Sequence, residues 1–154
     1  MRESGFVQAG TPRVVVVGYG AVGAYRAHTL MQGGCRLAIV SSDIESQSKA
    51  AVEHPCAWVA GSIEELDAGG YHWRECLAVI TLRAGSHYQI FHQLAYYGVR
   101  HMVFEEALAE SASELAGMAE RAAKEGISIR VSEPSPPDSY EQFLADLTGW
   151  IQAA

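Results

Sequence analysis

The 154-residue chain is 49% hydrophobic and 19% charged, a balance typical of one globular domain that folds without metal or disulfides. Its net charge of -7 and its scattered Lys and Arg residues argue against nucleic-acid binding through a basic patch. No stretch has the roughly 18 apolar residues that span a membrane, and the N-terminus lacks the apolar core of a signal peptide. We therefore expect a cytoplasmic protein with a disordered tail at residues 1–12 and no membrane partner.

The cysteines and histidines give no sign of a metal site. Cys35, Cys56 and Cys76 are far apart and form no CxxC pair, so reduced thiols are expected. The six histidines lack the short paired spacing of zinc ligands. His87 and His92 are five residues apart, which takes them off one helix face, and no metal ligand is predicted.

The first half of the chain is predicted to alternate strands and helices. Residues 13–18, RVVVVG, form a continuous β-branched run, which is typical of a strand covered on both faces. A helix is predicted over 21–32, and Gly33-Gly34 ends it. The strand RLAIVS, a polar helix over 43–53 and the short strand AWVA follow.

The second half continues the alternation. Ser62 with Glu65, Ser86 with Gln89, and Ser111 with Glu114 have the spacing of capping boxes at helix starts. Gly98 and Gly126 are expected to end the second and third of these helices. The predicted strands ECLAVIT and RHMVF separate these three helices, and the strand ISIRVS follows the last of them. Residues 133–154 are predicted to be a Pro-rich linker and a C-terminal helix.

This alternation predicts an α/β fold. Strands and helices joined by short loops build a doubly wound parallel sheet, here of about six strands, with helices on both faces. The expected single domain covers residues 13–132.

A glycine motif, GYGAVG, follows the first predicted strand directly and opens a helix. In the spacing G-x-G-x-x-G, the first glycine permits a tight turn, the second lets the backbone approach a pyrophosphate, and the third lets the helix pack on the sheet. The N–H groups at the helix start favour an anion. The alternative is a glycine-rich turn that binds nothing. We predict a dinucleotide-binding Rossmann domain with this loop as cofactor site: Gly18, Tyr19, Gly20, Ala21, Val22 and Gly23.

A residue for the cofactor's ribose is expected after the second strand, where the sequence reads Ser41-Ser42-Asp43. Asp43 could accept hydrogen bonds from the ribose hydroxyls of NAD, or it could cap the following helix. The serine hydroxyls, with Lys49 nearby, would also tolerate the 2′-phosphate of NADP. The choice between NAD and NADP stays open.

Three segments together resemble the N-terminal nucleotide-binding half of the Gfo/Idh/MocA oxidoreductases, over about residues 13–131. They are VVVVGYGAVG, LAVITLRAGSH after SIEEL, and LAYYGVRHMVFEEALAES. The last segment is similar to the family motif ALxxGxHVxxEKP, with Gly98 at its first glycine and Glu105 at its glutamate. Glu106 stands where the family has its lysine, and Leu82 stands where a proline follows the strand-ending threonine.

The resemblance implies site residues and a function. Thr81 and Leu82 are expected beside the cofactor, and Glu105, Glu106 and His87 are the catalytic candidates, although His87 could equally be a satisfied helix-terminus histidine. The family lysine positions the substrate and assists proton transfer, and Glu106 reverses that charge.

The family's substrate domain has no counterpart in this sequence, and we therefore consider two hypotheses about function. In the first, the chain is an NAD(P)-binding protein that performs redox or lysine-independent chemistry on a small molecule, its site completed by a second subunit or partner in a homodimer or hetero-oligomer. In the second, it is a non-catalytic module that binds a nucleotide or a protein. A weaker third reading is non-redox catalysis by the Glu105/Glu106 pair.

Overall fold

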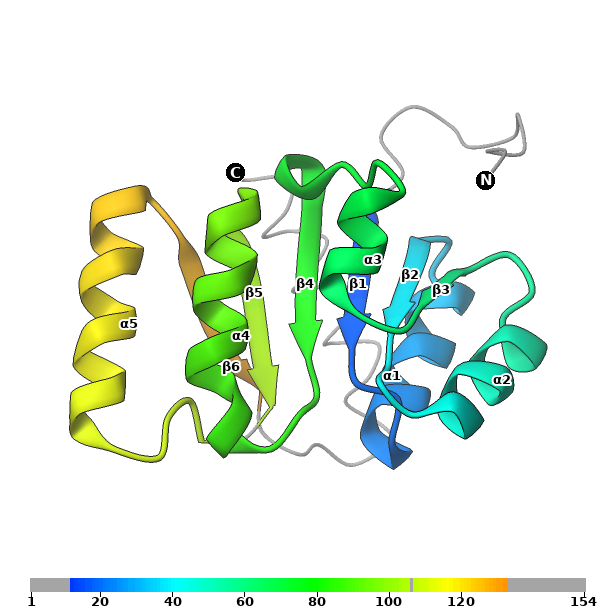
Figure 1. The fold of residues 1–154 in the computed structure, drawn as a ribbon, viewed down its shortest axis with the longest axis horizontal. Coiled ribbons are helices and arrows are strands. Elements are labelled where there is room, and N and C mark those ends of the chain that lie inside the picture. Colours follow the sequence, from blue (N-terminus) through cyan, green and yellow to red (C-terminus); the bar gives the residue numbers. More distant parts are fainter. Residues whose placement is uncertain (1–11, 106, 133–154) are drawn as a thin grey trace.

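The computed structural model describes residues 12–105 and 107–132. Within them, six parallel strands form one sheet in the order β3-β2-β1-β4-β5-β6 (Figure 1). The predicted fold class, a doubly wound α/β sandwich, is confirmed. The strands are β1 (Arg13–Val17), β2 (Arg36–Val40), β3 (Trp58–Ala60), β4 (Cys76–Ile80), β5 (His101–Glu105) and β6 (Ser128–Ser132).

Helices cover both faces of this sheet. In Figure 1, α3, α4 and α5 lie in front of the strands and α1 lies behind them. The chain also forms the short 3-10 helix η1 (Trp73–Glu75) before β4. The α-helices are α1 (Ala21–Gln32), α2 (Ile44–Glu53), α3 (Ile63–Ala68), α4 (Ala84–Tyr97) and α5 (Ala112–Glu125).

The all-valine run of β1 explains why this strand is central. Successive side chains of a strand point to opposite faces. Val14 and Val16 therefore pack in the core beneath α1 and α2, whereas Val15 and Val17 pack in the core beneath α3, α4 and α5. A strand buried on both faces needs apolar residues at every position, which is what the sequence pattern predicted.

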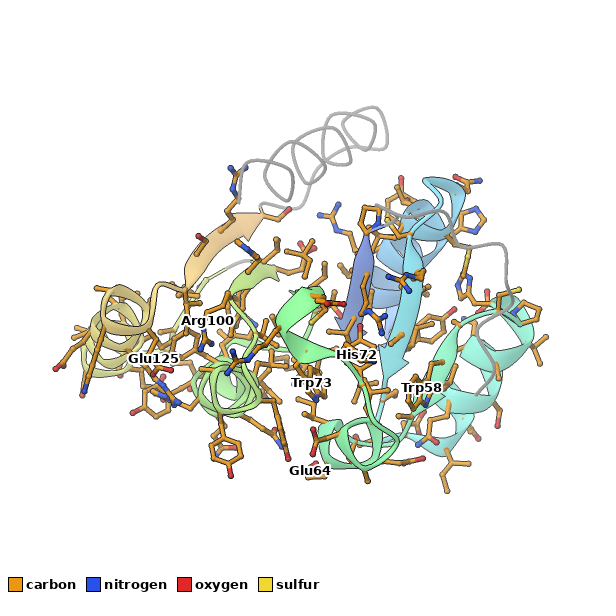
Figure 2. All side chains as sticks on the ribbon, turned by 90° about the horizontal axis from the view of Figure 1, so that it is seen from above. Trp58, Glu64, His72, Trp73, Arg100 and Glu125 are labelled. Atoms are coloured by element: carbon orange, nitrogen blue, oxygen red, sulfur yellow. The ribbon has the colours of Figure 1, made fainter. Side chains whose placement is uncertain are left out.

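Aromatic residues fill the space between the sheet and α3, where Figure 2 labels Trp58 and Trp73. The Tyr71 ring lies between the two tryptophans, with centroid distances of 5.9 Å to Trp58 and 4.8 Å to Trp73. The Trp73 indole N–H donates to Asp67 of α3 at 2.9 Å. Both tryptophans are therefore packing residues.

Two of the three predicted serine caps are confirmed. Ser62 and Ser111 accept hydrogen bonds from the backbone N–H groups of Glu65 and Glu114, at 3.0 and 3.1 Å. The prediction for Ser86 was wrong: α4 begins at Ala84, with Arg83 as N-cap and no side-chain cap. The Ser86 N–H donates to Arg83 O at 2.9 Å, which places Ser86 within the first turn.

Helix α5 packs less deeply than its apolar stripe suggests. Met118 is fully buried, but Leu115, three residues before it on the same helix, is 45% exposed. The helix lies at the outer edge of the sheet, beside β6 and next to α4 (Figure 1). The predictions for the N-terminal tail, for Glu106 and for residues 133–154 fall outside the described residues, apart from Pro12.

Candidate dinucleotide-binding site

The glycine loop lies between β1 and α1 at the C-terminal edge of the sheet. Gly18 has a φ of +104°, a conformation that side chains rarely adopt, and a Cβ there would meet Thr81 Oγ1 at 2.7 Å. A Cβ on Gly23 would lie 2.2 Å from Gly18 O. Gly18 and Gly23 are therefore required by close packing, in the roles that the motif assigns to its first and third glycines.

Gly20 differs from its neighbours because its environment is open. A Cβ there would meet nothing within 4 Å. Gly20 is the N-cap of α1, which has neither a side-chain cap nor an acidic residue in its first turn. The first N–H groups of a helix lack intrahelical acceptors and carry the positive end of its dipole. The open surface at Gly20, Ala21 and Val22 therefore fits the pyrophosphate of a dinucleotide.

Tyr19 occupies the centre of the G-x-G turn, yet its side chain is buried. Its hydroxyl donates to Glu53 Oε1 at 3.1 Å, which joins the loop to the last turn of α2. Burial, together with the neighbouring Glu53 carboxylate, raises the pKa of Tyr19 to about 12. Because its side chain is turned into the protein, Tyr19 would contact a cofactor through its backbone.

The residues that follow β4, the other strand beside β1, pack against the glycine loop. Thr81 Oγ1 lies 3.2 Å from Val17 O and 3.1 Å from Gly18 O, and both carbonyls accept from this one hydroxyl. The Leu82 side chain would lie 3.1 Å from a Cβ on Gly18. Both residues, predicted beside the cofactor, therefore support the glycine loop. The sheet order reverses between β1 and β4, the point at which doubly wound sheets bind ligands.

Asp43 caps α2, one of its two predicted roles. Its Oδ2 accepts from the Ser46 N–H at 2.9 Å and from the Ser46 hydroxyl at 2.7 Å. These hydrogen bonds hold the pKa of Asp43 below its usual range. Ser42 beside it is exposed, and Ser41 is buried, with its hydroxyl 3.4 Å from the Asp43 N–H. Capping uses only one carboxylate oxygen, so this geometry leaves the ribose role untested.

Glu105, the first acid of the EE pair, is buried at the end of β5. Its Oε1 accepts from Arg26 Nε at 2.6 Å, and its Oε2 accepts from Arg26 Nη2 at 3.2 Å. Arg26 Nη2 also donates to Ser132 Oγ of β6 at 3.0 Å. The carboxylate that matches the family glutamate thus holds α1 to the sheet. A catalytic role for Glu106 stays a prediction, because this residue lies outside the described part.

Sequence reasoning missed Arg26, although a signal was present. Arg26 is next to Ala27 and follows Gly23 by three residues, so it falls on the stripe of α1 that faces the sheet. A cation on a buried stripe requires an anion nearby, since an unpaired buried charge is costly. A buried acid at a strand end, such as Glu105, is the partner to look for.

His87, the third catalytic candidate, has a relative exposure of 0%. Its Nδ1 lies 3.0 Å from Ala107 O and 3.2 Å from Leu108 O, and its Nε2 lies 2.8 Å from Leu82 O. Both ring nitrogens thus face backbone carbonyls rather than a cleft. This geometry favours the reading of His87 as a satisfied histidine near a helix start.

The described residues contain neither a metal-binding cluster nor a membrane-spanning helix. No group of three or more His, Cys, Asp or Glu side chains in residues 12–105 and 107–132 is arranged to hold a metal ion. In the same residues, every helix is too short or too polar to cross a bilayer.

Comparisons with known proteins agree with this geometry. A family model described as "Putative NAD(P)-binding" matches residues 6–124, which is most of the chain. No curated protein sequence matches the chain significantly.

Many solved structures share the fold. They include myo-inositol 2-dehydrogenase from Lactobacillus plantarum (TM-score 0.69, 16% identity, 79% of this chain and 36% of that one). The WlbA dehydrogenase from Chromobacterium violaceum, in complex with NADH and UDP-GlcNAcA, has a TM-score of 0.69 at 18% identity, over 79% of this chain and 35% of that one. An oxidoreductase from Agrobacterium radiobacter, in complex with NAD+, L-tartaric acid and magnesium, has a TM-score of 0.68 at 18% identity, over 78% and 34%.

The chain therefore spans about a third of the length of these dehydrogenases. The part that it matches is the N-terminal Rossmann part of Gfo/Idh/MocA-type dehydrogenases, in agreement with the resemblance of the sequence motifs. At these identities the solved structures establish the fold, and the family model carries the relationship to nucleotide-binding proteins.

Proposed function

Because the chain belongs to the NAD(P)-binding family whose model spans residues 6–124, we propose that it binds a nicotinamide dinucleotide across the C-terminal edge of its sheet. The observation that carries this proposal is the contrast within the glycine loop. Gly18 and Gly23 are closed in by packing, whereas Gly20 is open at the uncapped N-terminus of α1. A turn that bound nothing would gain nothing from leaving that helix end uncapped.

We propose that NAD(H) is preferred over NADP(H). The capping bonds use Asp43 Oδ2, which leaves Oδ1 able to accept from the ribose hydroxyls. A lowered pKa keeps this exposed carboxylate charged at neutral pH, and it would repel a 2′-phosphate. Lys49, which could have favoured the phosphate, lies 3.9 Å from Glu53 at the opposite end of α2.

For chemistry, we propose oxidoreduction of a small molecule, with the substrate part of the site supplied by a second subunit or a partner protein. When bound, the nicotinamide would supply hydride transfer. The residues of this chain hold and orient the dinucleotide, and the Arg26–Glu105 pair fixes α1 against the sheet. The solved dehydrogenases are nearly three times as long as the part of them that this chain matches. A mass of 16.6 kDa by light scattering would contradict a homo-oligomer.

The second candidate is a module that binds the nucleotide, or a protein, without catalysis. This second candidate is favoured because two of the catalytic candidates already have structural partners. Glu105 pairs with Arg26, and His87 is buried against backbone carbonyls. Cofactor turnover with the complete assembly would reject this candidate. Binding without turnover in every assembly would support it.

Titration with NADH, followed by its fluorescence, tests nucleotide binding. In Gly20→Asp, a carboxylate occupies the open position where the pyrophosphate would lie, so affinity should fall by more than about tenfold. Ser48→Asp adds the same charge on the exposed side of α2 and is the matched control. Failure of wild type to bind NADH or NADPH at about millimolar concentration would overturn the proposal, since this is weaker than ordinary cofactor affinities.

A further inference from the structure

His87 joins two loops that leave neighbouring strands at the C-terminal edge of the sheet. Leu82, whose carbonyl faces Nε2 at 2.8 Å, belongs to the loop between β4 and α4. Ala107 and Leu108, whose carbonyls face Nδ1 at 3.0 and 3.2 Å, belong to the loop between β5 and α5. One imidazole on the first turn of α4 thus spans both connections.

The first of these loops also supports the glycine loop. Thr81 Oγ1 bonds to the Gly18 carbonyl at 3.1 Å, and the Leu82 side chain closes on Gly18. A continuous series of contacts therefore runs from the glycine loop through Thr81 and Leu82 to His87, and on to the β5–α5 loop.

A second contact joins the same two loops. The Glu110 carboxylate, from the β5–α5 loop, would lie 2.9 Å from a Cβ on Gly85 in the first turn of α4. A carboxylate is favoured there by the positive end of the helix dipole. This contact is at the surface, since both residues are exposed, whereas His87 is completely buried.

A buried histidine often only fills a core. The His87 ring does pack on Phe104, with a centroid distance of 4.9 Å. A filling role does not require polar atoms, however, and a ring nitrogen that carries the proton can donate to the carbonyls it faces; the tautomer decides which loop receives this hydrogen bond. These carbonyls belong to two loops at the C-terminal edge of the sheet, where the nucleotide is proposed to bind, and this position suggests a more specific task.

We propose that His87 is a positioning residue that couples the β5–α5 loop to the glycine loop, so that nucleotide binding orders residues 107–111. This inference rests on the proposed function for the identity of the nucleotide. The coupling between the loops does not depend on it and can be measured in the ligand-free chain.

Hydrogen exchange followed by mass spectrometry tests the coupling. In His87→Leu, which keeps an apolar side chain against Phe104, amides of residues 82–86 and 107–111 should exchange about tenfold faster, the effect of losing one or two hydrogen bonds. In His87→Gln, whose amide N–H groups can still donate to a loop carbonyl, the acceleration should be smaller. Leu94→Ala is the control, because Leu94 is equally buried on α4 but lies far along the helix from both loops.

NADH supplies the second arm of the experiment. Saturating NADH should slow exchange of residues 107–111 in wild type and in Leu94→Ala, but not in His87→Leu. The inference would be overturned if His87→Leu and Leu94→Ala accelerated exchange equally throughout the domain. It would also be overturned if exchange of residues 107–111 were unchanged in both His87 variants. If wild type binds no NADH, the proposed function fails, and the ligand-free comparison still decides whether His87 couples the loops. If His87→Leu does not fold, His87→Gln gives the same comparison.

Discussion

Arg26 of α1 and Glu105 of β5 form a two-point ion pair, with Nε to Oε1 at 2.6 Å and Nη2 to Oε2 at 3.2 Å. Their side chains are only 2% and 7% exposed. The pair joins the helix that begins at the glycine loop to a strand at the far side of β4. It also explains the doubled acid at the end of β5: the first carboxylate is a structural counter-ion.

Removal of one partner should therefore be strongly destabilising. We expect Arg26→Met to lower the free energy of unfolding by about 3–5 kcal/mol, because it leaves the Glu105 carboxylate buried and unpaired. In Arg26→Met/Glu105→Leu, most of this loss should be recovered, since no isolated charge remains. Urea unfolding of both variants measures the difference, and a double variant less stable than Arg26→Met would contradict the reading.

The partly exposed Arg121–Glu125 pair of α5 is the control for this prediction. It has a similar distance, 2.5 Å, but its side chains are 28% and 30% exposed. Water already solvates much of both charges, so Arg121→Met should change the urea midpoint far less than Arg26→Met.

Gly20 and Gly23 of the loop should respond differently to alanine. Gly23→Ala places a methyl group 2.2 Å from the Gly18 carbonyl oxygen, so the loop or α1 must shift. We expect a loss of about 1–3 kcal/mol or more in unfolding free energy, the usual cost of overpacking. Gly20→Ala meets nothing and should keep the stability of wild type. Thermal unfolding of the two variants checks this, and equal midpoints would show that the loop tolerates a side chain at Gly23.

Asp43 allows capping and cofactor selection to be separated. Asp43→Asn keeps a side-chain oxygen for the Ser46 N–H, so α2 should stay capped, because Asn and Asp are comparable N-caps. It removes the charge that disfavours a 2′-phosphate, so the ratio of NADP to NAD affinity should rise about tenfold. Fluorescence titration with NADH and NADPH measures the ratio, and an unchanged ratio in Asp43→Asn would leave Asp43 as a cap alone.

The sequence predicts most of this fold because its signals are local. The valine run of β1, the serine caps at Ser62 and Ser111, and the glycine stops at Gly98 and Gly126 each depend on a few neighbouring residues. The start of α4 was missed because Arg83 caps it through its backbone conformation and offers no side-chain signal.

The candidate site was harder to predict because its contacts are long-range. Arg26 and Glu105 are 79 residues apart in sequence, and His87 reaches Ala107 across 20 residues. Composition and periodicity identify such residues as buried or polar but do not pair them. The position of the glycine loop between a strand and a helix was predicted correctly. Gly18, Gly20 and Gly23 lie within six residues, so this signal is local.

The contact between α4 and α5 should make stability depend on pH. His92 Nδ1 accepts from Arg121 Nη1 at 2.8 Å, so the hydrogen bond requires an unprotonated nitrogen. Burial, followed by the Arg121 charge, lowers the pKa of His92 below its ordinary value of 6.5. Burial also lowers the pKa of His54 and of His101.

These shifts set the sign of the dependence. Between the lowered pKa and 6.5, the unfolded chain binds more protons than the folded chain, so stability is fully present above 6.5 and falls as the pH drops through this window. His92→Asn offers Arg121 an amide oxygen that does not titrate, so its unfolding free energy should fall less steeply between about pH 7 and pH 5. Gln89→Asn, an exposed change on the same helix, should keep the wild-type slope. Urea unfolding at a series of pH values measures all three proteins, and a His92→Asn slope as steep as that of wild type would show that the Arg121 contact is not the sensitive one.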